Sequence, residues 1–308
     1  MRTPTLLALA LVFLPRPSPG QEPERLRWKG FDPAVSREYF QEITTKVKQA
    51  MKVMDTDVNQ TQEQTFLFRW VPGGLDKDQN WLATQEFVRV KMLIDIGGSK
   101  IDHDTDNPKG GGPLGGFFDA LVKTKLRYKL SPRLQVLDLT GHEDLIKRLK
   151  DAGGPGVGAM ENLFTKDALM TMAEPAFSAV PLDPVKVGST WKRTIEQKLP
   201  GVGRYQHDYT YTYEGKDGDL DKITFVARID IKPPNEEGGL PFKIRKIDIA
   251  EGAARGSALF DRRLGRFTKM EQTGTLQGTL VIDVGGMETT IRLLQTQTTT
   301  SRTTPKRP

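Results

Sequence analysis

The sequence predicts an α+β protein made mostly of long twisted antiparallel strands, with a short helical connector packed on a concave sheet face. Three observations support this class. Apolar and polar residues alternate with period two over long stretches, glycine-containing turns separate these stretches, and a single central region has helical spacing. Each predicted sheet therefore has one apolar face and one face in contact with water.

The alternation predicts the strands. It is clearest in residues 88–96, 191–199, 223–231 and 270–284. In the third stretch, for example, Phe225 points to the face opposite Arg228. The last stretch is much longer than the usual strand of about five or six residues. Strands of this length twist and curl, so the predicted sheet has a concave face that helices can cover.

Turn signals between these stretches predict antiparallel hairpins. The turns lie at residues 97–98, 216–219, 261–265 and 285–286. The helical region lies between them. Thr140 and Glu143 are spaced as a capping box ahead of Leu145 and Leu149, which predicts a helix. Two further short helices are predicted at residues 160–164 and, with Thr165 as the cap, around residues 166–172. Another is predicted at residues 117–122.

These elements divide the chain into five segments. They are a signal peptide (residues 1–20), an N-terminal β region (21–139), the helical connector (140–185), a C-terminal β region (186–300) and a disordered tail (301–308). The signal peptide is predicted from Arg2, the apolar run 6–14 and the small residues before Gln21. A signal peptide predicts that the mature chain is exported and is periplasmic or extracellular. Because the apolar run is about half the length that spans a bilayer, no transmembrane segment is expected in the mature chain.

Composition narrows the function classes. The chain has no cysteine, so it contains no disulfide and no thiol nucleophile. Its net charge of +6 is spread over 308 residues, which does not predict a nucleic-acid partner. Ser257 follows Gly256, but Leu259 stands where a nucleophile elbow needs glycine. No catalytic residue and no cofactor are predicted, and the sequence favours a non-enzymatic protein.

A candidate metal site lies at three alternating carboxylates, Asp102, Asp104 and Asp106. Oxygen ligands at this spacing begin a calcium loop. The remainder of such a loop is missing, because Asn107 replaces the turn glycine and Pro113 replaces the closing glutamate. An acidic hairpin arm in contact with water is therefore the favoured interpretation, and a bound cation is the alternative.

A candidate ligand-binding face is formed by alternating aromatic residues of one predicted strand. Its members are Tyr205, His207, Tyr209, Tyr211 and Tyr213. Tyrosine combines an apolar ring with a polar hydroxyl, which suits a sugar or an apolar ligand. The alternative is a sheet face packed beneath the connector helices, and the sequence favours this packed arrangement.

Several short segments resemble an exported bacterial family of unknown function. These segments are Trp28-Lys29-Gly30, the glutamines at 60, 62 and 64, residues 187–191, residues 211–216, and Phe260-Asp261 to Gly265-Arg266. They are turn and strand signatures, so the resemblance implies a fold and no functional residues.

Three functions fit these observations. The first is binding of an apolar or amphipathic envelope ligand, or of a protein partner, in the concave face; a lipid, a glycan and an envelope protein are the partner classes. The second is a glycosidase-like hydrolase whose two carboxylates are brought together by folding. The third is a purely structural envelope module. An apolar tunnel would favour the first function, buried paired carboxylates the second, and a filled core the third.

Overall fold

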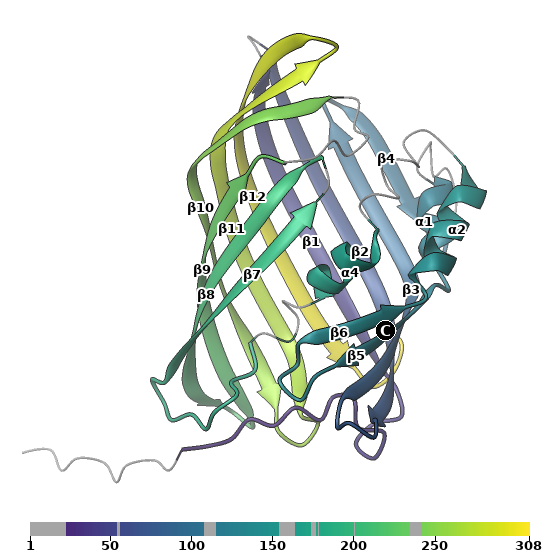
Figure 1. Cartoon of the computed structure of the whole chain (residues 1–308), viewed down its shortest axis with the longest axis vertical. Helices are drawn as coiled ribbons and strands as arrows, with labels where there is room; N and C mark the ends of the chain where they lie inside the picture. The colour runs from purple at the N-terminus through teal and green to yellow at the C-terminus, as the bar shows by residue number, and fades with distance from the viewer. Residues whose placement is uncertain are drawn as a thin grey trace, which may run out of the picture.

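The computed structural model describes residues 23–53, 56–107, 115–153, 164–173, 177, 179–199, 201–234 and 242–308 (Figure 1). The predicted signal peptide and most of the helix predicted at residues 160–164 lie outside this part of the chain. Within it, twelve strands form one antiparallel sheet. The strands are β1 (Tyr39–Val53), β2 (Thr56–Leu75), β3 (Trp81–Ile96), β4 (Ser99–Asp104), β5 (Lys125–Leu130), β6 (Val136–Thr140), β7 (Thr190–Leu199), β8 (Gly203–Asp217), β9 (Leu220–Lys232), β10 (Lys243–Asp261), β11 (Arg266–Val284) and β12 (Met287–Thr304).

The sheet is continuous because its first and last long strands pair with each other. The strand order is β6-β5-β3-β2-β1-β12-β11-β10-β9-β8-β7, and β4 pairs with the free part of β3. The β1–β12 register runs from Phe40 opposite Thr304 to Val53 opposite Ile291. This pairing joins the two predicted β regions into one sheet, and it extends the last strand to Thr304, into the segment expected to be a tail.

The hairpins form where the turn residues predict them. The turns at residues 97–98, 216–219, 261–265 and 285–286 connect β3 to β4, β8 to β9, β10 to β11 and β11 to β12. β11 also confirms the prediction of an unusually long strand.

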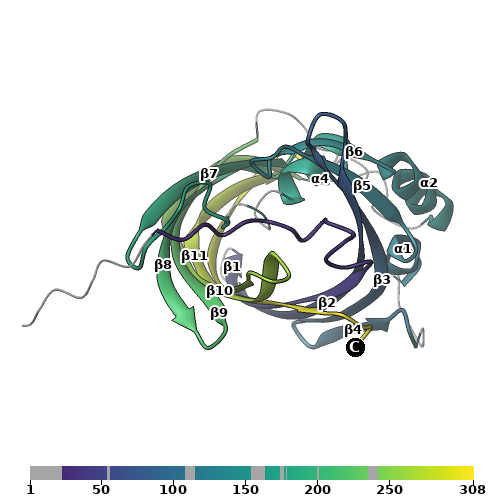
Figure 2. The ribbon, with the colours of Figure 1, turned by 90° about the horizontal axis from the view of Figure 1, so that it is seen from below.

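The long strands curl the sheet into a shell around an interior space (Figures 1 and 2). Strand twist accumulates across the sheet, and register shifts between β10 and β11, two with the extra residue in β10 and one with it in β11, bend the strands further. A glycine assists at one close contact. A Cβ atom at Gly256 would lie 2.5 Å from Cζ of Phe225, so the glycine leaves room for the tip of this ring.

The predicted α+β class is wrong: the chain is a mostly antiparallel β protein, and the three short helices of its described residues do not cover a concave sheet face. The curled sheet places its apolar residues opposite one another across the interior, so no helical layer is needed to cover them. Helix α4 (Lys166–Ala173) instead lies between the edge strands β6 and β7, where it buries Leu169 (Figure 2). Lys166 Nζ lies 2.5 Å from Asp138 Oδ1 of β6 and holds α4 there.

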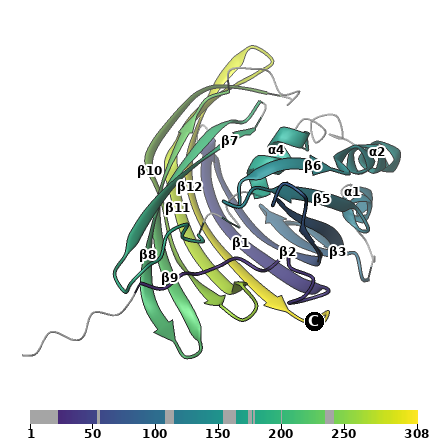
Figure 3. The same ribbon diagram turned by 60° about the horizontal axis from the view of Figure 1, so that its bottom comes forward.

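Helices α1 (Gly115–Leu121) and α2 (His142–Ala152) pack on each other beside β3 and β5 (Figure 3). The predicted capping box at Thr140 is wrong, because α2 begins after Gly141 in a left-handed conformation and has no side-chain cap. The predicted cap of α4 is confirmed: the Ala168 amide donates to Thr165 Oγ1 at 3.3 Å.

The N-terminal strap (residues 23–36) crosses the lower end of the shell (Figure 2). Its amides and carbonyls pair with Val185 before β7, Gly265 before β11 and Gly74 of β2, at 2.7–2.9 Å. The strap inserts Phe31, which is fully buried, against Trp70 with ring centres 5.4 Å apart. One end of the interior is therefore closed by backbone hydrogen bonds and aromatic packing.

Candidate functional site

The two faces of the curled sheet differ in chemistry, and the apolar face points inward. On β1, Tyr39 and Ile43 face the interior, whereas Lys46 is exposed and pairs with Glu63 across the neighbouring strand. On β12, Thr299 likewise faces the interior. The curled sheet therefore offers an apolar surface to a ligand inside the shell.

The interior contains an apolar cavity of about 640 Å³. Its wall comes from β1, β2, β3, β5, β7, α1 and α4. The apolar side chains that line it are Ile43, Phe66, Phe68, Trp70, Phe87, Met92, Ile94, Phe117, Phe118, Leu121, Leu126, Phe164, Leu169, Met172, Ala173, Phe177 and Leu199. Phe68 and Phe87 meet edge to face with ring centres 4.9 Å apart. This geometry is favourable for aromatic rings and fixes the shape of the wall.

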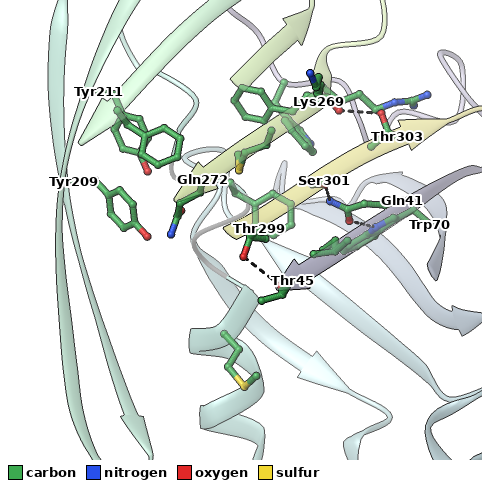
Figure 4. Close-up of a pocket in the computed structure, with 18 of the residues that line it drawn as sticks. Gln41, Thr45, Trp70, Tyr209, Tyr211, Lys269, Gln272, Thr299, Ser301 and Thr303 are labelled. Carbon is green, nitrogen blue, oxygen red and sulfur yellow. Dashed lines mark hydrogen bonds between the residues drawn. The ribbon is translucent and has the colours of Figure 1, made fainter. Parts of the chain in front are cut away.

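A second cavity, of about 490 Å³, adjoins the first and is more polar (Figure 4). Tyr209, Tyr211 and Phe225 line one side, and hydroxyl and amide side chains of β1, β11 and β12 line the other. These polar groups bond to one another: Thr45 and Thr299 hydroxyls lie 3.2 Å apart. Their network holds this wall in one arrangement while leaving the cavity open.

The two cavities share part of their walls. The shared side chains are Gln41, Ile43, Trp70, Met172, Phe177 and Gln197. Trp70 Nε1 donates to Gln41 Oε1 at 2.9 Å, and Gln41 Nε2 donates to Ser301 Oγ at 3.0 Å. The boundary thus consists of fixed aromatic and amide groups. The shared side chains place the two cavities side by side.

The charges on the cavity walls are all positive. Arg266 and Lys269 line the second cavity, and no aspartate or glutamate lines either cavity among the described residues. Lys269 has a partner, Glu271, at 2.6 Å. Arg266 is 3% exposed and lies over the ring of Tyr39. Burial lowers the pKa of Arg266 from its usual value, but an arginine remains charged at physiological pH.

The predicted tyrosine face is divided between the cavity wall and the core. Tyr209 and Tyr211 are buried and line the second cavity, with ring centres 5.5 Å apart. Tyr213 is fully buried, and its hydroxyl donates to Asp221 at 2.6 Å. Tyr205 and His207 line neither cavity. Burial raises the pKa of Tyr205 and Tyr209 and lowers that of His207, so all three side chains favour their neutral forms.

Two of the three carboxylates that were considered as a metal site are paired with arginines. Arg89 Nε donates to Asp104 at 2.9 Å, and hydrogen bonding to Arg89 lowers the pKa of Asp104. Arg307 donates to Asp106 at 2.7 Å. Asp102 is exposed on β4. Within the described part of the chain no group of three or more histidine, cysteine, aspartate or glutamate residues is placed to hold a metal ion.

Sequence reasoning missed most of the cavity wall. Phe66, Phe68 and Phe87 belong to alternating strands and carry no signal that separates a cavity wall from a filled core. Arg266 was noted only as part of a turn signature. Its position directly after the turn at residues 261–265 could have indicated an inward side chain only if the curl of the sheet had been known.

A model of a family of unknown function (DUF6263) matches residues 78–287, which is more than half of the chain. The chain belongs to this family. Membership in DUF6263 confirms the resemblance to an uncharacterised family, although export and the individual turn signatures stay predictions. No curated protein matches the sequence. Among the described residues of this DUF6263 member, no helix is long and apolar enough to cross a membrane.

Three solved structures align with this DUF6263 protein over most of its length, all from Pseudomonas aeruginosa. The outer membrane protein OprG is 6% identical with a TM-score of 0.24, and the alignment covers 91% of this chain and 99% of OprG. OccK7 (OpdD) is 6% identical with a TM-score of 0.19, covering 87% and 99%. OpdQ is 5% identical with a TM-score of 0.18, covering 87% and 98%. Similarity this low supports no conclusion about function.

Proposed function

We propose that this protein is a non-enzymatic envelope protein that binds an apolar or amphipathic ligand inside the curled sheet. The observation that carries the proposal is the apolar cavity of about 640 Å³ between β2, β3, α1 and α4. Ligand cavities in proteins have volumes of about 300–1,000 Å³ and are lined mainly by apolar and aromatic side chains with a few polar groups. The two adjoining cavities together have this composition.

The dense packing of protein interiors favours a bound ligand over an empty cavity. Protein interiors are packed about as densely as organic crystals, and the penalty for a void grows with its volume. Water is a poor filler here, because a buried water needs two to four polar partners and the wall of the larger cavity consists mainly of rings and aliphatic chains. An apolar ligand would bring its own contacts to Phe68, Phe87 and their neighbours.

The alternative functions receive less support. A glycosidase-like hydrolase needs two carboxyl groups facing the bound sugar. The described acidic residues line neither cavity, and buried Asp221 is bonded to Tyr213 and Arg262. A purely structural module needs no cavity of this size. The envelope location rests on the predicted signal peptide at residues 1–20.

Native mass spectrometry of protein purified from its own host tests the proposal. We expect a retained small molecule that denaturation releases. A protein that carries nothing, and that also fails to bind a neutral apolar probe such as N-phenyl-1-naphthylamine, would contradict the proposal.

A matched pair of variants locates the probe. Gln64 lines the apolar cavity, whereas its neighbour Glu63 points outward and forms an exposed ion pair with Lys46. Gln64→Trp should fill part of the cavity and weaken probe binding. Glu63→Trp adds the same ring outside and should leave binding unchanged. Equal effects of the two substitutions would place the probe elsewhere.

A further inference from the structure

The wall of the second cavity includes a buried cation, Arg266. Arg266 is 3% exposed, and its Nε and Nη1 atoms are buried without a hydrogen-bond partner among the described residues. Buried charges in proteins are normally paired, because removing an ion from water is strongly unfavourable unless an opposite charge and hydrogen bonds compensate. Arg266 lines the second cavity, so a ligand in that cavity is placed to supply the missing acceptor.

The stacking of Arg266 on Tyr39 does not replace this acceptor. The guanidinium carbon lies 4.0 Å from the centre of the ring, so the ring contacts the face of the planar group. Guanidinium N–H groups point along the plane, toward positions that a ring stacked on the face does not occupy. Asp261, the register partner of Arg266, attracts the guanidinium electrostatically, but its carboxylate accepts hydrogen bonds from the amides of Arg263 and Leu264 at 2.8 and 3.2 Å.

A second donor without a partner lines the same cavity. The Nε1 atom of Trp28 is buried and unbonded among the described residues. Trp28 and Arg266 both lie against Gly30 of the strap, where a Cβ atom would be 2.7 Å from Trp28 Cζ2 and 3.1 Å from Arg266 Cβ. Two side chains with unpaired donors therefore lie close together at the strap end of the interior, in a cavity whose described walls carry no acid.

We propose that the ligand is an amphipathic anion, and that Arg266, assisted by Trp28, binds its anionic oxygen group. This inference rests on the proposed function. The second cavity holds the headgroup, and the apolar chain extends past Ile43, Trp70 and Met172, which line both cavities, into the phenylalanine-rich cavity. The anionic headgroup then faces the cavity that contains Arg266, and the apolar chain faces the cavity lined by aromatic and aliphatic side chains.

Three ligands with the same chain test the inference. Dodecanoate, dodecyl phosphate and dodecanol are titrated into ligand-free protein, with displacement of N-phenyl-1-naphthylamine as the readout. Hydrogen bonds to a charged group predict that the anions bind roughly 10- to 100-fold more tightly than dodecanol. Arg266→Gln should abolish this ratio while leaving dodecanol binding unchanged. The anion that binds more tightly distinguishes a carboxylate from a phosphate headgroup.

The control variant is Arg263→Gln. Arg263 belongs to the same hairpin, and its side chain is 82% exposed, so the substitution makes the same change in net charge outside the cavity. It should preserve the ratio. Trp28→Phe keeps the ring, removes the N–H donor and should reduce the ratio partially.

The outcomes separate the two proposals. Equal binding of the three ligands by the unaltered protein, or an unchanged ratio in Arg266→Gln, overturns the anion inference and leaves apolar binding intact. Failure of every ligand to displace the probe overturns the proposed function and this inference with it. If Arg266→Gln does not fold, the ratio of anion affinity to dodecanol affinity in the unaltered protein still tests the anion inference.

Discussion

The guanidinium carbon of Arg266 lies 4.0 Å from the centre of the Tyr39 ring, and the Tyr39 ring is also stacked with Trp70, with ring centres 6.3 Å apart. The start of β11 is thereby connected to β1 and β2 across the lower end of the interior. Because the ring supplies a face and no in-plane acceptor, the contact holds the cation in position without neutralising it.

The Tyr39 ring should contribute to stability through this contact. Tyr39→Leu removes the face under Arg266 and is expected to lower the free energy of unfolding by about 2 kcal/mol or more. Tyr39→Phe keeps the ring and should lower it by less than about 1 kcal/mol. Urea unfolding measures both changes. A similar loss in the two variants would mean that the hydroxyl, and not the ring face, is responsible.

Tyr211 should act as a packed aromatic although it borders a cavity. It is 2% exposed and stacks with both Trp191 and Tyr209, with ring centres 5.5 Å apart in each pair. Tyr211→Ala is expected to cost about 3–5 kcal/mol of unfolding free energy, with a large fall in melting temperature. A melting temperature within a degree or two of the unaltered protein's would instead support an open groove in which the ring contacts only ligand.

Arg262 should be essential to the strap. Its Nε and Nη2 atoms lie 2.6 Å from the two oxygens of fully buried Asp221, and its Nη1 atom pairs with Glu24 of the strap. Arg262→Gln leaves Asp221 with Tyr213 and Lys216 as partners and is expected to lower the unfolding free energy by about 3 kcal/mol.

Arg263→Gln is the control for this substitution, since it removes an exposed arginine next in sequence and should change stability by less than about 0.5 kcal/mol. Chemical unfolding compares the two. Nearly equal stabilities would mean that the Asp221 network contributes little.

Acidification should destabilise the protein through His207. Burial lowers the pKa of this histidine in the folded state, so between the folded and unfolded values the unfolded chain binds more protons. Stability is then complete above the unfolded value, near pH 6.5, and falls as the pH drops below it. His207→Gln should flatten this part of the profile, measured by urea unfolding between pH 8 and 5. A profile that keeps its slope in the variant would assign the effect to other groups.

Strands and hairpins could be predicted from the sequence because alternation and turn residues involve only neighbouring positions in the chain. Alternation identified the strands from which β3, β7, β9 and β11 are built, and the turn residues placed four hairpins correctly. A β-bulge limited this reasoning in β3. Phe87 pairs with Phe68 and Arg89 with Leu67, so Val88 is the extra residue. Phe87 and Val90 are consequently both buried, three positions apart, which strict alternation does not predict.

The joining of the two β regions into one curled sheet could not be predicted in the same way. The β1–β12 pairing joins residues about 250 positions apart, such as Gln41 and Thr303, and no local pattern specifies it. The described helices were predicted at the right places in the sequence, but their packing was predicted wrongly, because a sheet that curls over its own apolar face needs no helical layer. The cavity and the burial of Arg266 follow from this curled sheet, and the candidate site was predicted only as far as Tyr209 and Tyr211.

Contact quenching of tryptophan fluorescence tests the central claim, that the interior binds the apolar ligand, most directly. Trp70 lines both cavities, whereas Trp81, at the start of β3, lines neither. Two proteins are compared, one keeping only Trp70 and one keeping only Trp81, with phenylalanine at the other tryptophan positions. Titration with a dodecyl chain brominated along its length should quench Trp70 strongly and to saturation while leaving Trp81 nearly unchanged. Equal quenching of the two, or quenching that never saturates, would contradict an interior binding site.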